Sequence, residues 1–226
     1  MSFIKAVTVV SVFLLTQCSN WNFNDKFTEG IVEYDIHYVN YSNQNFPLKL
    51  LPKTMEFKFN QNFASYTIED KMGIFSIRDV KSAKDHDHTT MIKFFSEKYA
   101  CQSKKKESPF FFKSNVPYKV VFLKDTFRMA GMSCKKANVT DINSSQSYDV
   151  AYTCLVGGKD PNANTPYKKI NGLLMDFKLQ IKNLEMTLTA KKIVSKKIND
   201  EDFLIPEGYK FISKKQMEGI ISNLLP

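Results

Sequence analysis

The sequence predicts a mainly β fold, built on an antiparallel sheet with few helices. Most of the chain after residue 26 alternates apolar and polar residues with a period of two, which is typical of strands with one buried face. The 226 residues include nineteen Phe and ten Tyr but only eight Gly, which indicates an interior or cavity lined by aromatic rings. Helical spacing of apolar residues is convincing only near the C-terminus.

Strands are predicted from the beginning of the domain onward. Residues 32–38 alternate strictly, and residues 55–59 and 64–68 repeat the pattern. Successive side chains of a strand point to opposite faces, so each run presents one apolar face. Further alternating runs predict strands at residues 73–80, 90–102, 118–124, 133–140 and 148–155.

The clearest hairpin lies at residues 175–190. Lys182 and Asn183 form its two-residue turn, since Asn tolerates the positive φ that such turns need. Folding about this turn pairs Ile181 with Leu184, Leu179 with Met186, Phe177 with Leu188 and Met175 with Ala190. Because a slip of one residue would turn one strand inside out, the register is strongly specified.

One helix is predicted, at the C-terminus. Ser213 and Gln216 have the spacing of a capping box, and Ile212 and Met217 that of a hydrophobic staple. An apolar stripe then follows at helical spacing, formed by Met217, Ile220, Ile221 and Leu224. A sheet with few helices buries one face by curving on itself or by being covered, and this helix is expected to lie on the sheet.

The N-terminus resembles the leader of a bacterial lipoprotein. A short start with Lys5 precedes the apolar residues 6–16, and eleven residues are far fewer than the about 20 that span a bilayer as a helix. Leu-Thr-Gln-Cys at residues 15–18 resembles a lipobox, although Gln is unusual before the cysteine. Only the thiol of Cys18 can take the diacylglyceryl group.

This resemblance divides the chain into three parts. Residues 1–17 are a signal peptide, residues 18–26 an acylated tether, and residues 27–226 a single domain. Two or more acyl chains on Cys18, palmitate among them, suffice for stable anchoring. The alternative is an uncleaved anchor or an ordinary secretory leader whose cysteine is accidental.

Three cysteines remain in the domain. If Thr140 faces Tyr148 across a hairpin, antiparallel counting brings Cys134 opposite Cys154, where a cross-strand disulfide would fit. Cys101 is then left over. The alternative is three buried thiols, because a change of register by one residue removes the alignment.

The charge pattern argues against a nucleic-acid partner. The formal net charge of +9 falls to +8 when Lys5 is lost with the leader, and the remaining lysines are spread along alternating strands. Such dispersed charge is typical of a solvated basic face near anionic lipid headgroups.

Catalytic motifs are not found in the sequence. It has no nucleophile elbow, P-loop, zinc-type cysteine pair or dinucleotide-binding glycine pattern, so no enzyme activity, cofactor or metal is expected. Asp-His-Asp-His at residues 85–88 is the nearest approach to a metal site, but no third ligand cluster is identifiable, and a solvated loop is predicted. His37 is predicted to be a surface histidine.

A basic run and an aromatic run adjoin each other in the middle of the chain. Lysines occupy residues 104–106, and Pro-Phe-Phe-Phe occupies residues 109–112. These rings could insert into a bilayer or plug a cavity, but ordinary core packing is the favoured interpretation.

Four stretches resemble the GLPGLI-type secreted and lipidated proteins of Bacteroidetes. They are Glu-Gly-Ile-Val-Glu-Tyr at residues 29–34, Ala-Gly-Met-Ser-Cys-Lys-Lys-Ala at 130–137, residues 165–167 with 171–175, and Phe-Leu-Ile-Pro-Glu-Gly-Tyr-Lys at 203–210. That group is similar to the LolA/LolB and LppX-like lipoprotein carriers. The resemblance implies a strongly curved antiparallel sheet, an incomplete barrel covered by helices, without enzyme activity. The glycine-rich motif is reduced here to Asn-Gly-Leu-Leu, and the carriers' functional basic residue has no counterpart.

The expected function is that of a cell-envelope lipoprotein, held by Cys18 in the outer membrane and facing the periplasm. Its half-barrel would bind a lipid or another apolar ligand, since burial of apolar surface contributes roughly 25 cal/mol per Å². The alternative is a structural or interaction lipoprotein whose core is filled by its own side chains.

Overall fold

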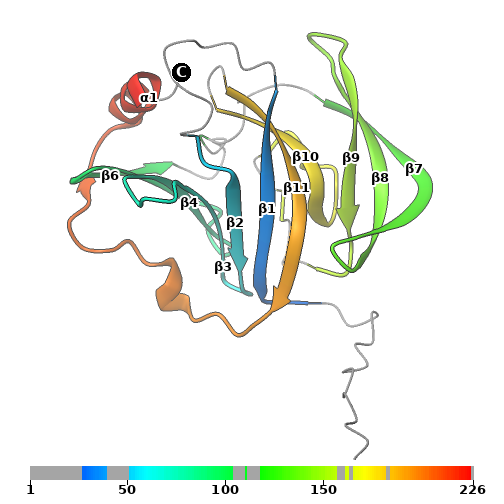
Figure 1. The fold of residues 1–226 in the computed structure, drawn as a ribbon, viewed down its shortest axis with the longest axis horizontal. Helices are drawn as coiled ribbons and strands as arrows, with labels where there is room; N and C mark the ends of the chain where they lie inside the picture. The colour runs from blue at the N-terminus through cyan, green and yellow to red at the C-terminus, as the bar shows by residue number, and fades with distance from the viewer. Residues whose placement is uncertain are drawn as a thin grey trace, which may run out of the picture.

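The computed structural model describes residues 27–39, 51–103, 110, 118–156, 161–162, 165–181 and 184–224. Within these residues twelve strands form one open sheet, in the order β12-β6-β5-β4-β3-β2-β1-β11-β10-β9-β8-β7 (Figure 1). The strands are β1 (Gly30–Val39), β2 (Thr54–Phe59), β3 (Phe63–Glu69), β4 (Phe75–Ser82), β5 (His88–Phe94), β6 (Glu97–Ser103), β7 (Tyr118–Met129), β8 (Met132–Asp141), β9 (Ser147–Thr153), β10 (Leu173–Ile181), β11 (Leu184–Ser195) and β12 (Lys210–Phe211). The prediction of a mainly β fold is confirmed.

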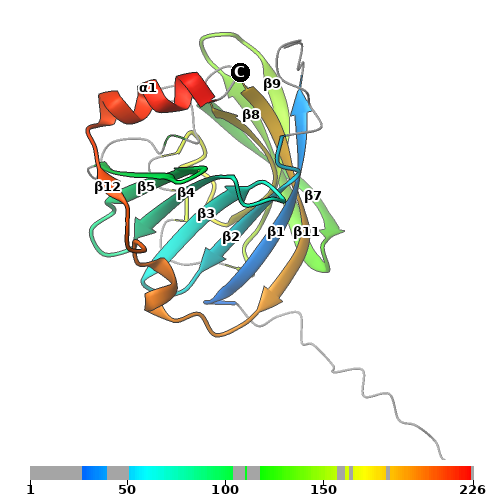
Figure 2. The same cartoon turned by 60° about the vertical axis from the view of Figure 1, so that its left-hand side comes forward.

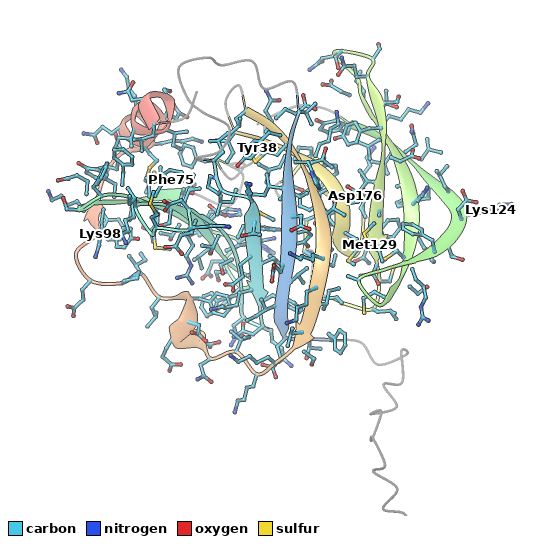
Figure 3. The ribbon with its side chains drawn as sticks, viewed as in Figure 1. Tyr38, Phe75, Lys98, Lys124, Met129 and Asp176 are labelled. Atoms are coloured by element: carbon cyan, nitrogen blue, oxygen red, sulfur yellow. The ribbon has the colours of Figure 1, made fainter. Side chains whose placement is uncertain are left out.

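Two antiparallel meanders make up the sheet. Strands β1 to β6 run from the centre to one edge, β7 to β11 run from the other edge back to the centre, and β1 pairs with β11 where they meet. Lys98 on β6 and Lys124 on β7 lie near the two opposite sides (Figure 3). Among the named strands, only the short β12 departs from the predicted antiparallel pairing, because it runs parallel to β6; the isolated bridge between Phe27 and Val156 is parallel as well.

The predicted hairpin forms in the predicted register. Ile181 pairs with Leu184, Leu179 with Met186 and Phe177 with Leu188. All six side chains are buried in the main hydrophobic core. The turn at residues 182–183 lies outside the described residues.

The single strand predicted at residues 90–102 is wrong, because the chain folds there into the hairpin of β5 and β6. Phe94 pairs with Glu97 across a turn at Phe95, whose φ is +51°. The backbone N–H of Phe95 donates to the carbonyl of Ile74, 2.8 Å away in the neighbouring loop. A tertiary contact therefore holds a turn that has no glycine, proline or asparagine to mark it.

The C-terminal helix α1 (Lys214–Leu224) begins as predicted. The backbone N–H of Ser213 donates to Oε1 of Gln216 at 2.9 Å, and the backbone N–H of Gln216 donates to Oγ of Ser213 at 3.3 Å. Met217 and Ile221 are buried in the main core, and α1 lies beside β6 (Figure 2). The capping box and the inner half of the predicted stripe are confirmed.

A second, smaller core lies on the opposite face of β4 to β6. Val80, Met91 and Ala100 pack there with Ile198 and Phe203 from the connection between β11 and β12. This connection includes the 3-10 helix η2 (Asp200–Phe203) and passes beneath the lower ends of β2 to β4 (Figure 1). Both faces of this part of the sheet are therefore covered by apolar packing.

The predicted alignment of Cys134 with Cys154 is wrong. Thr140 pairs with Ser147 instead of Tyr148, so β8 and β9 are displaced by one residue from the predicted register. Since successive side chains alternate across the sheet, Cys134 is buried while Cys154 is exposed, and both are thiols without a disulfide. The third cysteine of the domain, Cys101, is buried in the main core.

Several predictions fall on undescribed segments. Cys18, the signal peptide at residues 1–17 and the tether at residues 18–26 lie outside the described residues, as does the basic run at residues 104–106. Of the aromatic run only Phe110 is described, and it packs against the main core. Among described segments, no helix has the length and apolarity needed to cross a membrane.

Candidate functional site

The candidate site lies where β9 and β10 cease to pair. Their described ladder ends at Ala151 and Asp176, and β10 then continues beside β11. A cavity of about 250 Å³ opens here between these strands, the start of β7 and the turn from β8 to β9. It is lined by Tyr118, Asp141, Ser144, Gln146, Tyr148, Pro166, Tyr167, Lys178, Leu179, Gln180 and Glu185, and we call it the tyrosine cavity.

Three tyrosine rings form the aromatic wall of the tyrosine cavity. The ring of Tyr118 stacks on that of Tyr167, with centroids 6.0 Å apart and planes 13° apart. Tyr148 meets Tyr118 edge to face, at 6.4 Å and 84°. Tyr167 is fully buried and also contacts Phe177 of the main core, at 5.9 Å and 80°. The core therefore fixes the ring of Tyr167, which orients Tyr118 by stacking, and Tyr118 in turn meets Tyr148.

The hydroxyl groups of the tyrosines are joined in a chain. The hydroxyl of Tyr167 donates to the backbone carbonyl of Lys178 at 2.6 Å. Since a carbonyl can only accept, the 2.8 Å contact between Tyr148 and Tyr167 uses the proton of Tyr148. This chain ties β9 to β10 beyond the point where their backbone ladder ends.

An ion pair forms a second wall. Nζ of Lys178 lies 2.6 Å from Oε1 of Glu185 and 5.0 Å from the centroid of the Tyr148 ring. Both charged side chains are about one-third exposed, at 33% and 35%. The ammonium group thus has an anionic partner and an aromatic partner already in place.

The turn from β8 to β9 supplies the rim. Oδ1 of Asp141 accepts hydrogen bonds from the backbone N–H groups of Asn143 (2.8 Å) and Ser144 (3.3 Å), and the backbone N–H of Asp141 donates to the carbonyl of Gln146. This bonding fixes the turn and brings the polar side chains of Ser144 and Gln146 to the opening.

The electrostatics of the tyrosine cavity keep its phenols neutral. Burial raises the pKa of Tyr167, Tyr148 and Tyr118 above the usual value. For Tyr118 the carboxylates of Asp141 and Glu185 raise the pKa further. The hydroxyls therefore serve as hydrogen-bonding groups across the physiological pH range.

The histidines identified in the sequence do not form a metal site. His88 lies in β5 instead of the predicted solvated loop, and its Nδ1 is 3.1 Å from Oδ2 of Asp79. Oγ1 of Thr90 donates to Oδ1 of the same carboxylate at 2.7 Å, and all three side chains are buried. The described residues contain no group of three or more potential metal ligands, and His37 is exposed, as predicted.

Sequence reasoning missed the residues of the tyrosine cavity. The alternation predicts only that Tyr118 and Tyr148 lie in strands, and Tyr167 enters only through the resemblance to GLPGLI-type proteins. The residues that line the cavity come from separate elements between residues 118 and 185. The available signal was the high tyrosine content, which predicted an aromatic-lined interior or cavity but not its location.

The fold and the site define a large open β-sheet protein with a small aromatic and polar cavity. The chain is similar to two solved structures of PNGF-II, one in space group P21 and one in C2. Each has a TM-score of 0.50, with 13% and 12% identity over 86% of this chain, and the match spans about a third of PNGF-II (33% and 32%). This likeness shows the fold alone. No family model and no curated protein matches the chain.

Proposed function

We propose that this protein is a non-enzymatic, membrane-anchored lipoprotein of the cell envelope whose sheet domain binds a ligand. Lipid on Cys18 holds it in the outer membrane on the periplasmic side. The observation that carries the binding function is the tyrosine cavity, where aromatic rings and polar side chains converge on one partly open volume.

The anchor is supported by the sequence of the leader. The apolar run is too short to span a bilayer, and the cysteine stands where a lipobox requires it. An acylated Cys18 would keep the domain within reach of the membrane through a tether at residues 18–26.

The dimensions of the tyrosine cavity favour a small ligand. Its volume of about 250 Å³ lies just below the range of about 300 to 1,000 Å³ found for drug-sized ligands. A diacyl lipid is larger than this volume, and its apolar chains would lie against the carboxylates and amides of the lining, which gain nothing from contact with hydrocarbon. Within the described residues, the geometry supports a compact polar ligand better than the expected lipid.

The curvature of the sheet belongs to the same proposal. We propose an incomplete barrel of the kind found in LolA/LolB and LppX-like carriers, with α1 covering part of its inner face. The burial of Met217 and Ile221 in the main core supports this arrangement, because that core is formed mostly by one face of the sheet.

The anchor can be tested by labelling and fractionation. Full-length protein expressed in a bacterial host with an alkyne analogue of palmitate should be labelled and should sediment with membranes. Cys18→Ser should abolish both properties. The control Cys154→Ser, which changes an exposed cysteine directly after β9, should change neither. Unlabelled wild-type protein, or labelled Cys18→Ser, would contradict the proposal.

A filled core is the second candidate, favoured by one observation. The described apolar side chains of the sheet form a continuous buried cluster that includes α1. In that case the protein has a structural or interaction role and takes up no lipid. A saturable titration with a fluorescent fatty acid would oppose this candidate. A flat titration would support it if folded protein also fails to bind small polar ligands.

A further inference from the structure

The polar groups of the tyrosine cavity are mostly of a kind that both donates and accepts hydrogen bonds. The amides of Gln146 and Gln180 and the hydroxyls of Ser144 and Tyr118 all have this property. A ligand hydroxyl has it as well, since it donates one proton and offers two lone pairs. The lining therefore matches a ligand dense in hydroxyl groups.

Tyr118 provides a flat platform beside these polar groups. Its ring is half-buried, and its orientation is fixed by stacking on the buried ring of Tyr167. The face of an aromatic ring carries partial negative charge, and it attracts the polarised C–H groups that one face of a sugar ring presents. Within a cavity that is also lined by amides and carboxylates, such a platform can hold one face of the sugar ring while the polar groups bond its hydroxyls.

A cationic ligand fits this site less well. The cation position over Tyr148 is already taken by the ammonium group of Lys178, which also pairs with Glu185 at 2.6 Å. A second cation would face this like charge at short range. An anion would instead meet the carboxylates of Asp141 and Glu185.

We infer that the tyrosine cavity binds one neutral saccharide ring, stacked on Tyr118 and hydrogen-bonded by Gln146, Gln180 and Asp141. The inference rests on the proposed binding function and gives its ligand class. The remaining length of an oligosaccharide would extend past Ser144 at the open rim, because the turn from β8 to β9 is exposed there.

The test uses full-length protein in a detergent without a sugar headgroup. Saturation-transfer difference NMR is recorded with low-millimolar glucose, galactose, mannose, N-acetylglucosamine and their disaccharides. We expect at least one sugar to bind. Tyr118→Ala should weaken that binding about tenfold through loss of the platform, whereas Tyr118→Phe, which keeps the ring, should change it by less than about threefold. Tyr209→Ala, at a half-buried tyrosine of the second core, is the matched control and should leave it unchanged.

Choline and laurate are included as cationic and apolar probes. If every sugar fails while either probe binds in a manner that depends on Tyr118, the saccharide assignment is overturned but the binding function stands. If no compound binds to folded protein, both are overturned. Sugar binding that Tyr118→Ala leaves unchanged would also overturn the assignment, because the ligand would then lie elsewhere.

Discussion

The hydroxyl chain of the tyrosine cavity predicts a measurable coupling between two residues. Tyr167→Phe removes two hydrogen bonds, the one it donates to the carbonyl of Lys178 and the one it accepts from Tyr148. Each of these partly buried hydrogen bonds contributes about 1 kcal/mol, so this variant should lose about 2 kcal/mol of unfolding free energy. Tyr148→Phe removes the shared bond and should lose about 1 kcal/mol.

The double variant separates a bonded pair from two independent residues. Because the bond between the hydroxyls can be lost only once, Tyr148→Phe combined with Tyr167→Phe should cost about 2 kcal/mol, which is about 1 kcal/mol less than independent losses predict. Urea unfolding monitored by circular dichroism measures each value. The slope of the unfolding free energy against urea concentration should be the same for all variants, because both substitutions keep the rings and the buried apolar surface.

A second pair of tyrosines, which are not in contact, serves as the control for this double-mutant comparison. The hydroxyl of Tyr99 donates to Glu97 on β6, close to the opposite edge of the sheet from β9. Tyr99→Phe combined with Tyr148→Phe should therefore be additive. If Tyr148→Phe and Tyr167→Phe are equally additive, the hydroxyls do not bond, and the account of how β9 and β10 are joined at the cavity is refuted.

Three further predictions follow from burial and backbone geometry. Among the three described cysteines, a maleimide added without denaturant should label only Cys154, because Cys101 and Cys134 are buried and burial raises the pKa of Cys134 to about 11. Mass spectrometry that finds a protected Cys154 would contradict this. Burial also raises the pKa of several tyrosines above 10.0, so the folded state holds these protons more tightly. The free energy of unfolding that these tyrosines contribute should be fully retained below about pH 10 and should fall as the pH rises further. An unfolding free energy that stays constant up to about pH 12 would contradict the burial of these hydroxyls. Gly172→Ala should prevent folding or lower the melting temperature sharply, because its Cβ would lie 2.5 Å from the carbonyl oxygen of Thr153. Gly219 is exposed in the helix, so Gly219→Ala should instead stabilise the protein by up to about 1 kcal/mol. If the two alanine variants change the melting temperature equally, the close approach of the backbone at Gly172 is contradicted.

The β10 and β11 hairpin shows what the sequence can predict. Its register follows from local alternation, because any slip would expose a row of leucine, methionine and phenylalanine side chains. The capping box at Ser213 is equally local, and it too forms as predicted. Features fixed by neighbours a few residues apart are therefore recoverable without a structure.

Features fixed by distant contacts were not recoverable. The turn at Phe95 depends on a hydrogen bond to Ile74, and the position of His88 depends on the carboxylate of Asp79. The cysteine prediction failed because β8 and β9 pair one residue away from the register that was assumed. The tyrosine cavity arises only after the meander of β7 to β11 folds, where the ladder between β9 and β10 ends.

The central claim is that ligand binding takes place at the tyrosine cavity. Full-length protein labelled with ¹³C at its ten tyrosines can be titrated with the sugar panel, choline and laurate, while the ring resonances are followed by NMR. The account predicts saturable shifts of Tyr118 and Tyr148. Tyr34, a buried residue of β1 whose hydroxyl donates to the carbonyl of Leu174, should be unaffected. Shifts confined to tyrosines outside the cavity, or no shifts with any ligand, would contradict it.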